Sequence, residues 1–336
     1  MSEIAPGRAQ EMYHEGIREF GNVLLWEDQA KGDIILNAVL GGNVLLVGEP
    51  GGGKSTLARA SHLIIDGIND WDLAKIPPEA DLTPREVVGG RIEMDKKIAG
   101  PEGDTNETTS TEIPSLIKPW SKVIFGDEVN RVNPAVLNAL LSAYEERIIY
   151  NNTSQEVALH GLEYAISTMN PAENRAGVFP LTAALASRMG MGIILGNETP
   201  EVAREIRRHQ RNGWKSHPQD VRPVMNLDDL HAMRKGAHGV SFPENLDDLA
   251  DDYITRLNGA LRDGEDGKPQ IKESHQRMNG QMIDIAKASA YLGGKERIDE
   301  QDLNRAIRLI ATARLGALSP DAYRQLDGLL EYVFAR

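Results

Sequence analysis

The residues best suited to chemistry form a glycine-rich stretch directly after an apolar run. The run NVLLV (43–47) is followed by the pattern G-x-x-x-x-G-K-[ST], which starts at Gly48 and ends at Lys54 and Ser55. Glycines permit backbone angles at which successive N–H groups turn toward an anion, and a following helix adds partial positive charge. Lys54 would then reach the β- and γ-phosphates of a nucleotide, and the Ser55 hydroxyl would bind Mg²⁺. The predicted nucleotide-binding residues are Glu49, Pro50, Gly51, Gly52, Gly53, Lys54, Ser55 and Thr56.

Two later apolar runs end in polar residues that could complete a hydrolytic site. VIFG (123–126) is followed by Asp127 and Glu128, and EYAISTM (163–169) is followed by Asn170. Asp127 could hold Mg²⁺ through water, Glu128 could polarise the attacking water, and Asn170 could orient that water near the γ-phosphate. The alternatives are a solvated acidic turn for the carboxylates and a turn residue before a proline for the asparagine. The glycine-rich stretch earlier in the chain favours the catalytic interpretation of the carboxylates.

Three other side chains are candidates for contact with a nucleotide. Arg188 precedes an apolar run (191–195), and an arginine there could stabilise transition-state charge on a γ-phosphate held by a neighbouring subunit. An ordinary surface arginine is the alternative. Trp26 and Leu25 could line an adenine pocket, or could equally belong to the core. The eight histidines show no ligand spacing, so Ser55 and Asp127 are the only predicted metal-binding residues.

Apolar runs of strand length alternate with helical patterns in the first part of the chain. The runs lie at 43–47, 123–127, 163–169 and 191–195, with helical patterns at 54–65 and 134–147 and further helices predicted over 8–20 and 28–39. Such alternation predicts an α/β fold in which a parallel sheet is flanked by helices. A polar, threonine-rich stretch (100–111) interrupts the α/β pattern, and it could be a mobile loop or an inserted hairpin.

The pattern changes after about residue 197. Buried-strand runs stop, and helical patterns follow at 200–211, 226–236, 245–262, 274–292 and 300–315. We therefore predict a large α/β domain over 1–197, which includes N-terminal helices within 8–40, and a small all-helical lid domain over 198–336.

Composition limits the classes of partner. The net charge of −13 argues against a general affinity for nucleic-acid phosphates, although a local basic pore would be compatible with it. The chain has no cysteine, which excludes disulfides and fits the cytoplasm. Its first residues lack the apolar core of a signal peptide, and no apolar run approaches the roughly 18 residues that indicate a membrane helix.

Taken in order from about Val23 to Leu315, these motifs resemble the MoxR family of AAA+ ATPases, in the helix-2-insert clade that also contains magnesium-chelatase-type motors. The stretch ending in VGEPGGGKST is similar to the family's Walker A loop, FGDEVNRVNPAVLNALLSAYEER to its Walker B segment, and STMNPAENRAGVFPLTAALASRM to its sensor 1 and arginine-finger region. DLTPREVVGG resembles the stretch that leads into the family's helix-2 insertion, about 89–117 here. The segment 147–161 resembles the hairpin before sensor 1, and SHQRMNGQMIDIAKASAYL resembles the lid, which places Arg277 at the sensor 2 position.

The resemblance implies an ATPase that uses ATP and Mg²⁺ and assembles into a homo-oligomeric, hexameric ring. Arg188 would act on a neighbour's nucleotide, and Arg277 would reach from the lid to the nucleotide. The insertion and the hairpin would face the pore or top of the ring and touch a client, which the protein would remodel, activate or assemble. A partner with a von Willebrand A domain is a further expectation of the resemblance.

Three alternatives stay open at this point. The chain could be an assembly scaffold that is gated by nucleotide occupancy rather than turnover, or the motor subunit of a metal chelatase. It could also be a motor that acts on nucleic acid, although the acidic composition argues against that interpretation.

Overall fold

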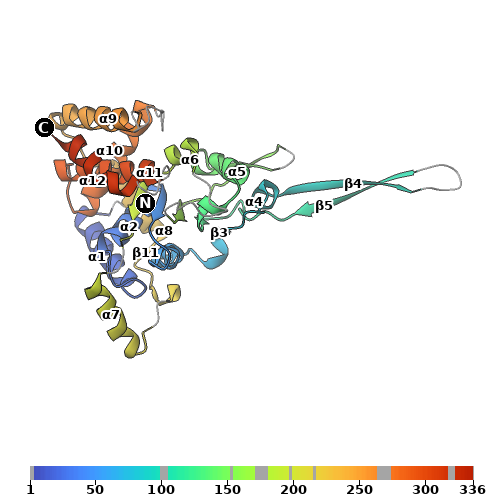
Figure 1. Ribbon diagram of the computed structural model, residues 1–336, viewed down its shortest axis with the longest axis horizontal. Coiled ribbons are helices and arrows are strands. Elements are labelled where there is room, and N and C mark those ends of the chain that lie inside the picture. Colours follow the sequence, from blue (N-terminus) through green and yellow to red (C-terminus); the bar gives the residue numbers. More distant parts are fainter. Residues whose placement is uncertain are drawn as a thin grey trace.

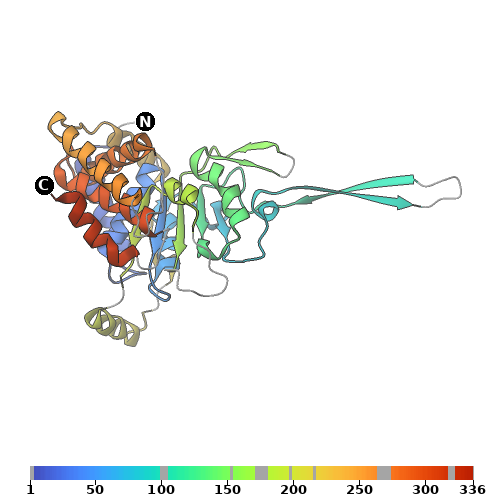
Figure 2. The same ribbon diagram turned by 45° about the horizontal axis from the view of Figure 1, so that its top comes forward.

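The computed structural model describes residues 4–98, 105–151, 154–170, 181–196, 199–214, 217–262, 274–316 and 322–335. It has a body built from one sheet and several layers of helices, and a long two-stranded arm projects from it (Figures 1 and 2). No helix within these ranges is long and apolar enough to cross a membrane.

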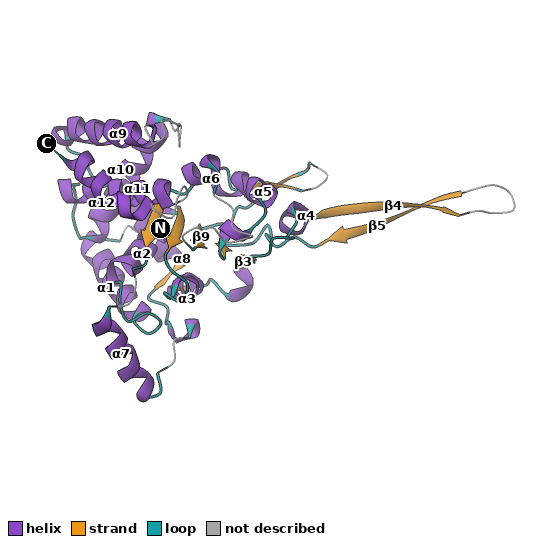
Figure 3. Ribbon diagram, in the orientation of Figure 1, coloured by secondary structure: helices purple, strands orange, loops and turns teal. Residues whose placement is uncertain are grey.

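The centre of the body is a sheet of five parallel strands (Figure 3). In spatial order they are β10 (Met191–Ile194), β1 (Asn43–Val47), β9 (Tyr164–Met169), β6 (Val123–Gly126) and β3 (Leu73–Ile76). Four of the five strands lie within the predicted apolar runs. The run-based prediction missed β3, because this edge strand is short and carries the exposed Lys75 at its middle.

Alternate residues of β1 face two separate apolar layers. Val44 and Leu46 belong to the first core, and Leu45 belongs to the second. Helices α1 (Pro6–Phe20), α2 (Asp28–Leu40), α3 (Lys54–Ala60) and much of the C-terminal helical region line the first core, whereas α4 (Pro84–Val88), α5 (Pro134–Glu145) and α6 (Ala183–Arg188) line the second. Burial on both faces explains why these strands are continuous apolar runs rather than alternating ones.

One predicted helix is shorter than its pattern suggested. The interval 54–65 contains α3, which ends at Ala60, and then a 3-10 turn over Ser61–Ile64 that leads into β2 (Ile65–Asp66). The Ser61 hydroxyl lies 2.8 Å from the Ala58 carbonyl and 3.1 Å from the Tyr164 hydroxyl, so it competes with the helical backbone at this point.

The C-terminal part is almost entirely helical. Its helices are α7 (Pro200–Arg211), α8 (Leu227–His238), α9 (Asp247–Arg262), α10 (His275–Leu292), α11 (Glu300–Gly316) and α12 (Ala322–Phe334), the last of which was not predicted. The expected boundary at 197–198 lies outside the described residues. After α7 the chain returns to the first domain, because β11 (Met225–Asn226) pairs with β2.

The helical region shares a core with the sheet. Arg305 of α11 donates to the Asp33 carboxylate of α2 over 3.0 Å and to the Tyr13 hydroxyl of α1 over 3.1 Å. Burial raises the pKa of Asp33, and the adjacent Arg305 guanidinium acts in the opposite direction. The two N-terminal helices are thereby tied to the lid by a buried ion pair.

Two hairpins occupy the segments that resemble the family's insertions. The arm consists of β4 (Gly90–Ile98) and β5 (Thr105–Ile113), which pair antiparallel along their full length (Figure 2). At its base the Ser115 hydroxyl donates to the Val87 carbonyl of α4 over 2.7 Å, and Leu116 N–H donates to the Glu86 carbonyl over 3.0 Å. The second hairpin joins β7 (Ile148–Tyr150) to β8 (Glu156–Ala158).

Gly192 of β10 lets α11 pack directly on the sheet, because a Cβ there would lie 2.2 Å from the Ala313 nitrogen. We predict that Gly192→Ala lowers the free energy of unfolding by about 1–3 kcal/mol, the usual cost of overpacking. Urea denaturation would measure the change. The matched control is Gly328→Ala in α12, where a Cβ meets nothing within 4 Å and helix propensity alone predicts a gain of up to about 1 kcal/mol. Equal midpoints for the two variants would contradict the packing argument.

Candidate active site

The predicted catalytic residues meet at one edge of the sheet. The glycine-rich loop follows β1, Asp127 follows β6, and Asn170 follows β9. These three strands are parallel neighbours, so their carboxyl ends lie side by side. The carboxyl edge of an open parallel sheet is where such folds bind ligands.

The loop after β1 has the backbone shape that anion binding requires. Gly51 and Gly53 have positive φ angles of 86° and 81°. A Cβ at Gly53 would also lie 2.8 Å from the Leu24 side chain, so this glycine is needed both for its angle and for space. Lys54 is only 4% exposed, and its Nζ donates to the Glu49 carbonyl over 2.7 Å. The ammonium group therefore already points into the loop that would surround a phosphate.

The charge on Lys54 depends on its acidic neighbours. Burial lowers the pKa of this lysine, while the carboxylates of Glu128, Glu49 and Asp127 oppose that shift. A bound triphosphate would add negative charge at the same place and favour the protonated form further.

Ser55 and Asp127 form a hydroxyl–carboxylate pair of the type that binds Mg²⁺. The Ser55 hydroxyl lies 2.7 Å from Oδ1 of Asp127, and the Thr168 hydroxyl donates to the same oxygen over 2.9 Å. Arg59 binds the other oxygen over 3.1 Å. Mg²⁺ prefers such oxygen ligands and is usually held by one or two carboxylates plus substrate phosphates, so this donor set fits the ion.

Glu128 is held in a strained conformation next to the pair. Its φ of 41° lies in the left-handed region, which is uncommon for a residue with a side chain. Thr168 accepts its backbone N–H over 2.9 Å, Asn170 donates to Oε1 over 2.9 Å, and Arg131 pairs with Oε2 over 2.8 Å. One contact thus holds the backbone of Glu128, and two others fix the direction of its carboxylate.

Asn170 presents an oxygen that could hold water beside Glu128. Its side-chain nitrogen binds Glu128, and its buried Oδ1 has no hydrogen-bond partner in the described part of the chain. A buried acceptor without a partner is costly, and a bound water would satisfy it.

The residues expected near the adenine base directly follow a residue that contacts the loop. Leu24, which the sequence reasoning did not single out, contacts Gly53, whereas Leu25 and Trp26 follow it and are half-buried. Trp26 packs against the first core, and its buried indole nitrogen has no partner among the described residues. A role for Leu25 and Trp26 at the adenine stays a prediction.

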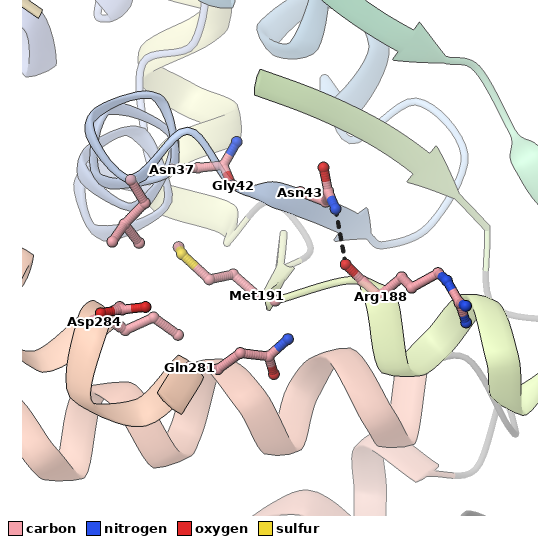
Figure 4. Close-up of a pocket in the computed structure, with 10 residues that line it drawn as sticks. Asn37, Gly42, Asn43, Arg188, Met191, Gln281 and Asp284 are labelled. Carbon is pink, nitrogen blue, oxygen red and sulfur yellow. Dashed lines mark hydrogen bonds between the residues drawn. The ribbon is translucent and has the colours of Figure 1, made fainter. Parts of the chain in front are cut away.

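Arg188 lies at the opposite edge of the sheet. It ends α6 just before β10, and its carbonyl accepts from the Asn43 side chain, the first residue of β1, over 2.9 Å. The phosphate-binding loop follows the last residue of that strand. Figure 4 shows the Arg188 side chain pointing away from a small cavity of about 150 Å³ between α2, β10 and α10. Arg188 therefore cannot reach the phosphates of its own subunit without a large rearrangement.

Arg277 lies with Arg188 rather than at the nucleotide loop. Its guanidinium pairs with Glu145 and lies 3.3 Å from the Ser187 hydroxyl, and Glu145 also pairs with Arg188 over 2.5 Å. This placement keeps Arg277 away from the nucleotide loop of its own subunit, because α10 lies at the amino edge of the sheet. The expected reach of Arg277 from the lid to a nucleotide stays a prediction. The sequence reasoning missed four contact residues: Glu145, Thr168, Arg59 and Arg131. The first three depend on partners distant in sequence, and Arg131 depends on the conformation of the turn after Glu128.

Comparisons with known proteins agree with this geometry. A family model described as an AAA domain of the dynein-related subfamily matches residues 43–189. The chain is 24% identical over 325 residues to the chaperone MoxR1 of Mycobacterium tuberculosis, covering 93% of this chain and 79% of that protein. It is 26% identical over 292 residues to an uncharacterized protein of Methanocaldococcus jannaschii, covering 86% and 69%.

A solved structure shares the fold. The crystal structure of a proposed ATPase from Cytophaga hutchinsonii matches with a TM-score of 0.68 at 21% identity, and the match covers 97% of this chain and 96% of that one. At this identity the likeness shows the fold alone. It confirms the predicted parallel sheet flanked by helices and followed by a helical region.

Thr168 connects the two catalytic carboxylates, since its hydroxyl donates to Asp127 and accepts from Glu128 N–H. We predict that Thr168→Val lowers the rate of triphosphate hydrolysis about ten-fold, because a hydrogen bond to a charged group contributes at least about 1.5 kcal/mol. Nucleotide affinity should change much less, since the loop after β1 is untouched. Single-turnover hydrolysis and binding of a fluorescent nucleotide would separate the two.

The control makes the same chemical change at a purely structural site. The Thr83 hydroxyl caps α4 by accepting from Glu86 N–H, so Thr83→Val should lower stability by about 1 kcal/mol and leave the hydrolytic rate unchanged. Equal rate losses in both variants would show that Thr168 acts only on stability.

Proposed function

We propose, from the chain's membership of the MoxR-type AAA+ ATPases, that it hydrolyses ATP in active sites shared between the subunits of a ring and uses the energy to remodel a partner protein. The observation that carries the proposal is the division of the catalytic groups between two edges of one sheet. The loop, Asp127, Glu128 and Asn170 lie at the carboxyl edge, while Arg188 lies at the amino edge.

At the carboxyl edge, the residues can bind ATP and direct water at its γ-phosphorus. Backbone N–H groups of residues 49–55 surround the phosphates, and Lys54 contributes the positive charge. Asn170 holds the water, and Glu128 takes up its proton as the new P–O bond forms and the bond to ADP breaks. Mg²⁺, which Ser55 and Asp127 would hold, neutralises charge on the phosphates when bound.

The Arg188 side chain can serve only a neighbouring subunit in this arrangement. Five residues of β1 separate the two edges, which corresponds to roughly 16 Å at 3.3 Å per residue. When one subunit's amino edge faces the next subunit's carboxyl edge, Arg188 comes to the neighbour's γ-phosphate and stabilises the transition-state charge. A head-to-tail contact of this kind closes into a ring, and we propose a hexamer.

The two hairpins are the proposed contacts with the client. The β4–β5 arm extends away from the body, and the β7–β8 hairpin lies beside α5 near its base (Figure 1). The relative named a chaperone supports a client protein as the target, and we extend this to partners that carry a von Willebrand A domain. The cysteine-free composition fits a cytoplasmic location.

The first test is steady-state ATP hydrolysis against protein concentration for the wild type and Arg188→Ala. We expect activity per subunit to rise as rings assemble, and we expect Arg188→Ala to lose at least about 10³-fold in turnover, the range for such arginines, while ATP still binds. The matched control is Arg204→Ala, because Arg204 is exposed on α7 and pairs only with its own helix in the described structure.

Two outcomes would count against the proposal. If activity per subunit is independent of concentration and Arg188→Ala is silent, the site is not shared. If Glu128→Gln binds ATP without turnover but still supports the client, occupancy rather than hydrolysis drives the function, and the protein is a nucleotide-gated scaffold.

A further inference from the structure

Glu145 is a single carboxylate that holds two arginines from different parts of the fold. It lies at the C-terminal end of α5 and pairs with Arg188 of α6 over 2.5 Å and with Arg277 of the lid helix α10. Each arginine uses a different carboxylate oxygen. We propose that Glu145 is a positioning residue of the shared active site, which fixes Arg188 at the surface that the neighbouring subunit's nucleotide approaches.

Glu145 binds both arginines, yet their side chains stay partly exposed to solvent. The side chains of Arg188 and Arg277 are 22% and 38% exposed, and that of Glu145 is 32% exposed. Arg188 also donates to the Ala184 carbonyl of its own helix over 2.9 Å. Two guanidinium groups this close repel each other, and the shared carboxylate offsets that repulsion while leaving a net positive charge for a phosphate.

A lid residue holds the main chain on both sides of Arg188. Fully buried Arg314 of α11 donates to the carbonyls of Ala186 and Met189 over 3.0 and 2.6 Å, which caps the C-terminal end of α6. Asn43 of β1 binds the Arg188 carbonyl from the other side, as Figure 4 shows. With its main chain held at both sides, the remaining freedom of Arg188 lies in its side chain, and Glu145 restricts it.

Restricting that side chain has a kinetic consequence. The side chain of a free arginine samples many rotamers, and this freedom must be lost whenever the side chain binds the transition state. Glu145 removes most of that freedom before the neighbour's phosphate arrives, as preorganisation of a catalytic group does. The effect should therefore fall on turnover and not on ATP binding, because the nucleotide loop lies at the opposite edge.

The inference rests on the proposed shared site and is tested with Glu145→Gln, which keeps the shape and removes the charge. We expect kcat to fall about ten-fold, with the KM for ATP and the ring assembly measured by sedimentation unchanged. The matched control is Glu146→Gln, because Glu146 is the next residue, is exposed and makes no ion pair within the described part of the chain. In an Arg188→Ala background, Glu145→Gln should cause no further loss, since the carboxylate acts through that arginine.

Mixed rings distinguish action on the neighbour from a local structural defect. Glu145→Gln subunits keep an intact Glu128, and Glu128→Gln subunits keep intact Glu145 and Arg188. Mixing the two should raise turnover per Glu145→Gln subunit above its level alone. Turnover per Glu145→Gln subunit that stays unchanged on mixing would overturn the inference, as would full activity of Glu145→Gln on its own. If Arg188→Ala keeps full turnover, the proposed shared site itself is wrong. Failure of the Glu145 inference alone can therefore be distinguished from failure of the proposed function.

Discussion

The direction of five strands determines what this protein can do with a nucleotide. Because β10, β1, β9, β6 and β3 all run the same way, every carboxyl end lies at one edge and every amino end at the other. The loop, the Asp127–Ser55 pair, Glu128 and Asn170 are thereby brought together, although Ser55 and Asp127 are 72 residues apart in the chain and Glu128 and Asn170 are 42 apart. The same rule excludes Arg188 from that cluster. A single subunit therefore carries the loop and the two carboxylates at one edge and Arg188 at the other, with the length of β1 between them.

The second constraint is that the lid is not a separate body in this structure. Arg305 joins α11 to α2 through Asp33, α11 packs on β10 at Gly192, and Arg314 caps the short helix that carries Arg188. Any rearrangement of the lid must consequently move the base of Arg188 or break buried ionic contacts, which costs several kcal/mol when one partner is left unpaired. The ion pair between Glu145 and Arg277 is half-exposed, so breaking it costs less than breaking the buried contacts of Arg305 and Arg314.

The sequence predicted those parts of the fold and site that are local in the chain. Lys54, Ser55, Asp127, Glu128 and Asn170 each end or follow an apolar run, so their positions could be inferred from the strand pattern. Thr168 could not, because it lies inside such a run and its partners are about 40 residues away. The position of Arg277 depends on which edge of the sheet α10 packs against, which helical periodicity does not encode. The edge strand β3 was missed because it is only four residues long and the exposed Lys75 interrupts its apolar signal.

The length of the β4–β5 arm enlarges any rotation that occurs at its base. Nine paired residues in each strand make it roughly 30 Å long at about 3.3 Å per residue. Its described contacts with the body include those at its base, where Leu116 and Ser115 bind the backbone of α4, and α4 packs on α5. A rotation of that anchor by about 10° would sweep the far end through roughly 5 Å, which exceeds the rise of three helical residues. The arm is thus a lever, because a small rotation of α4 against α5 becomes a displacement of several ångströms at the far end of the paired strands.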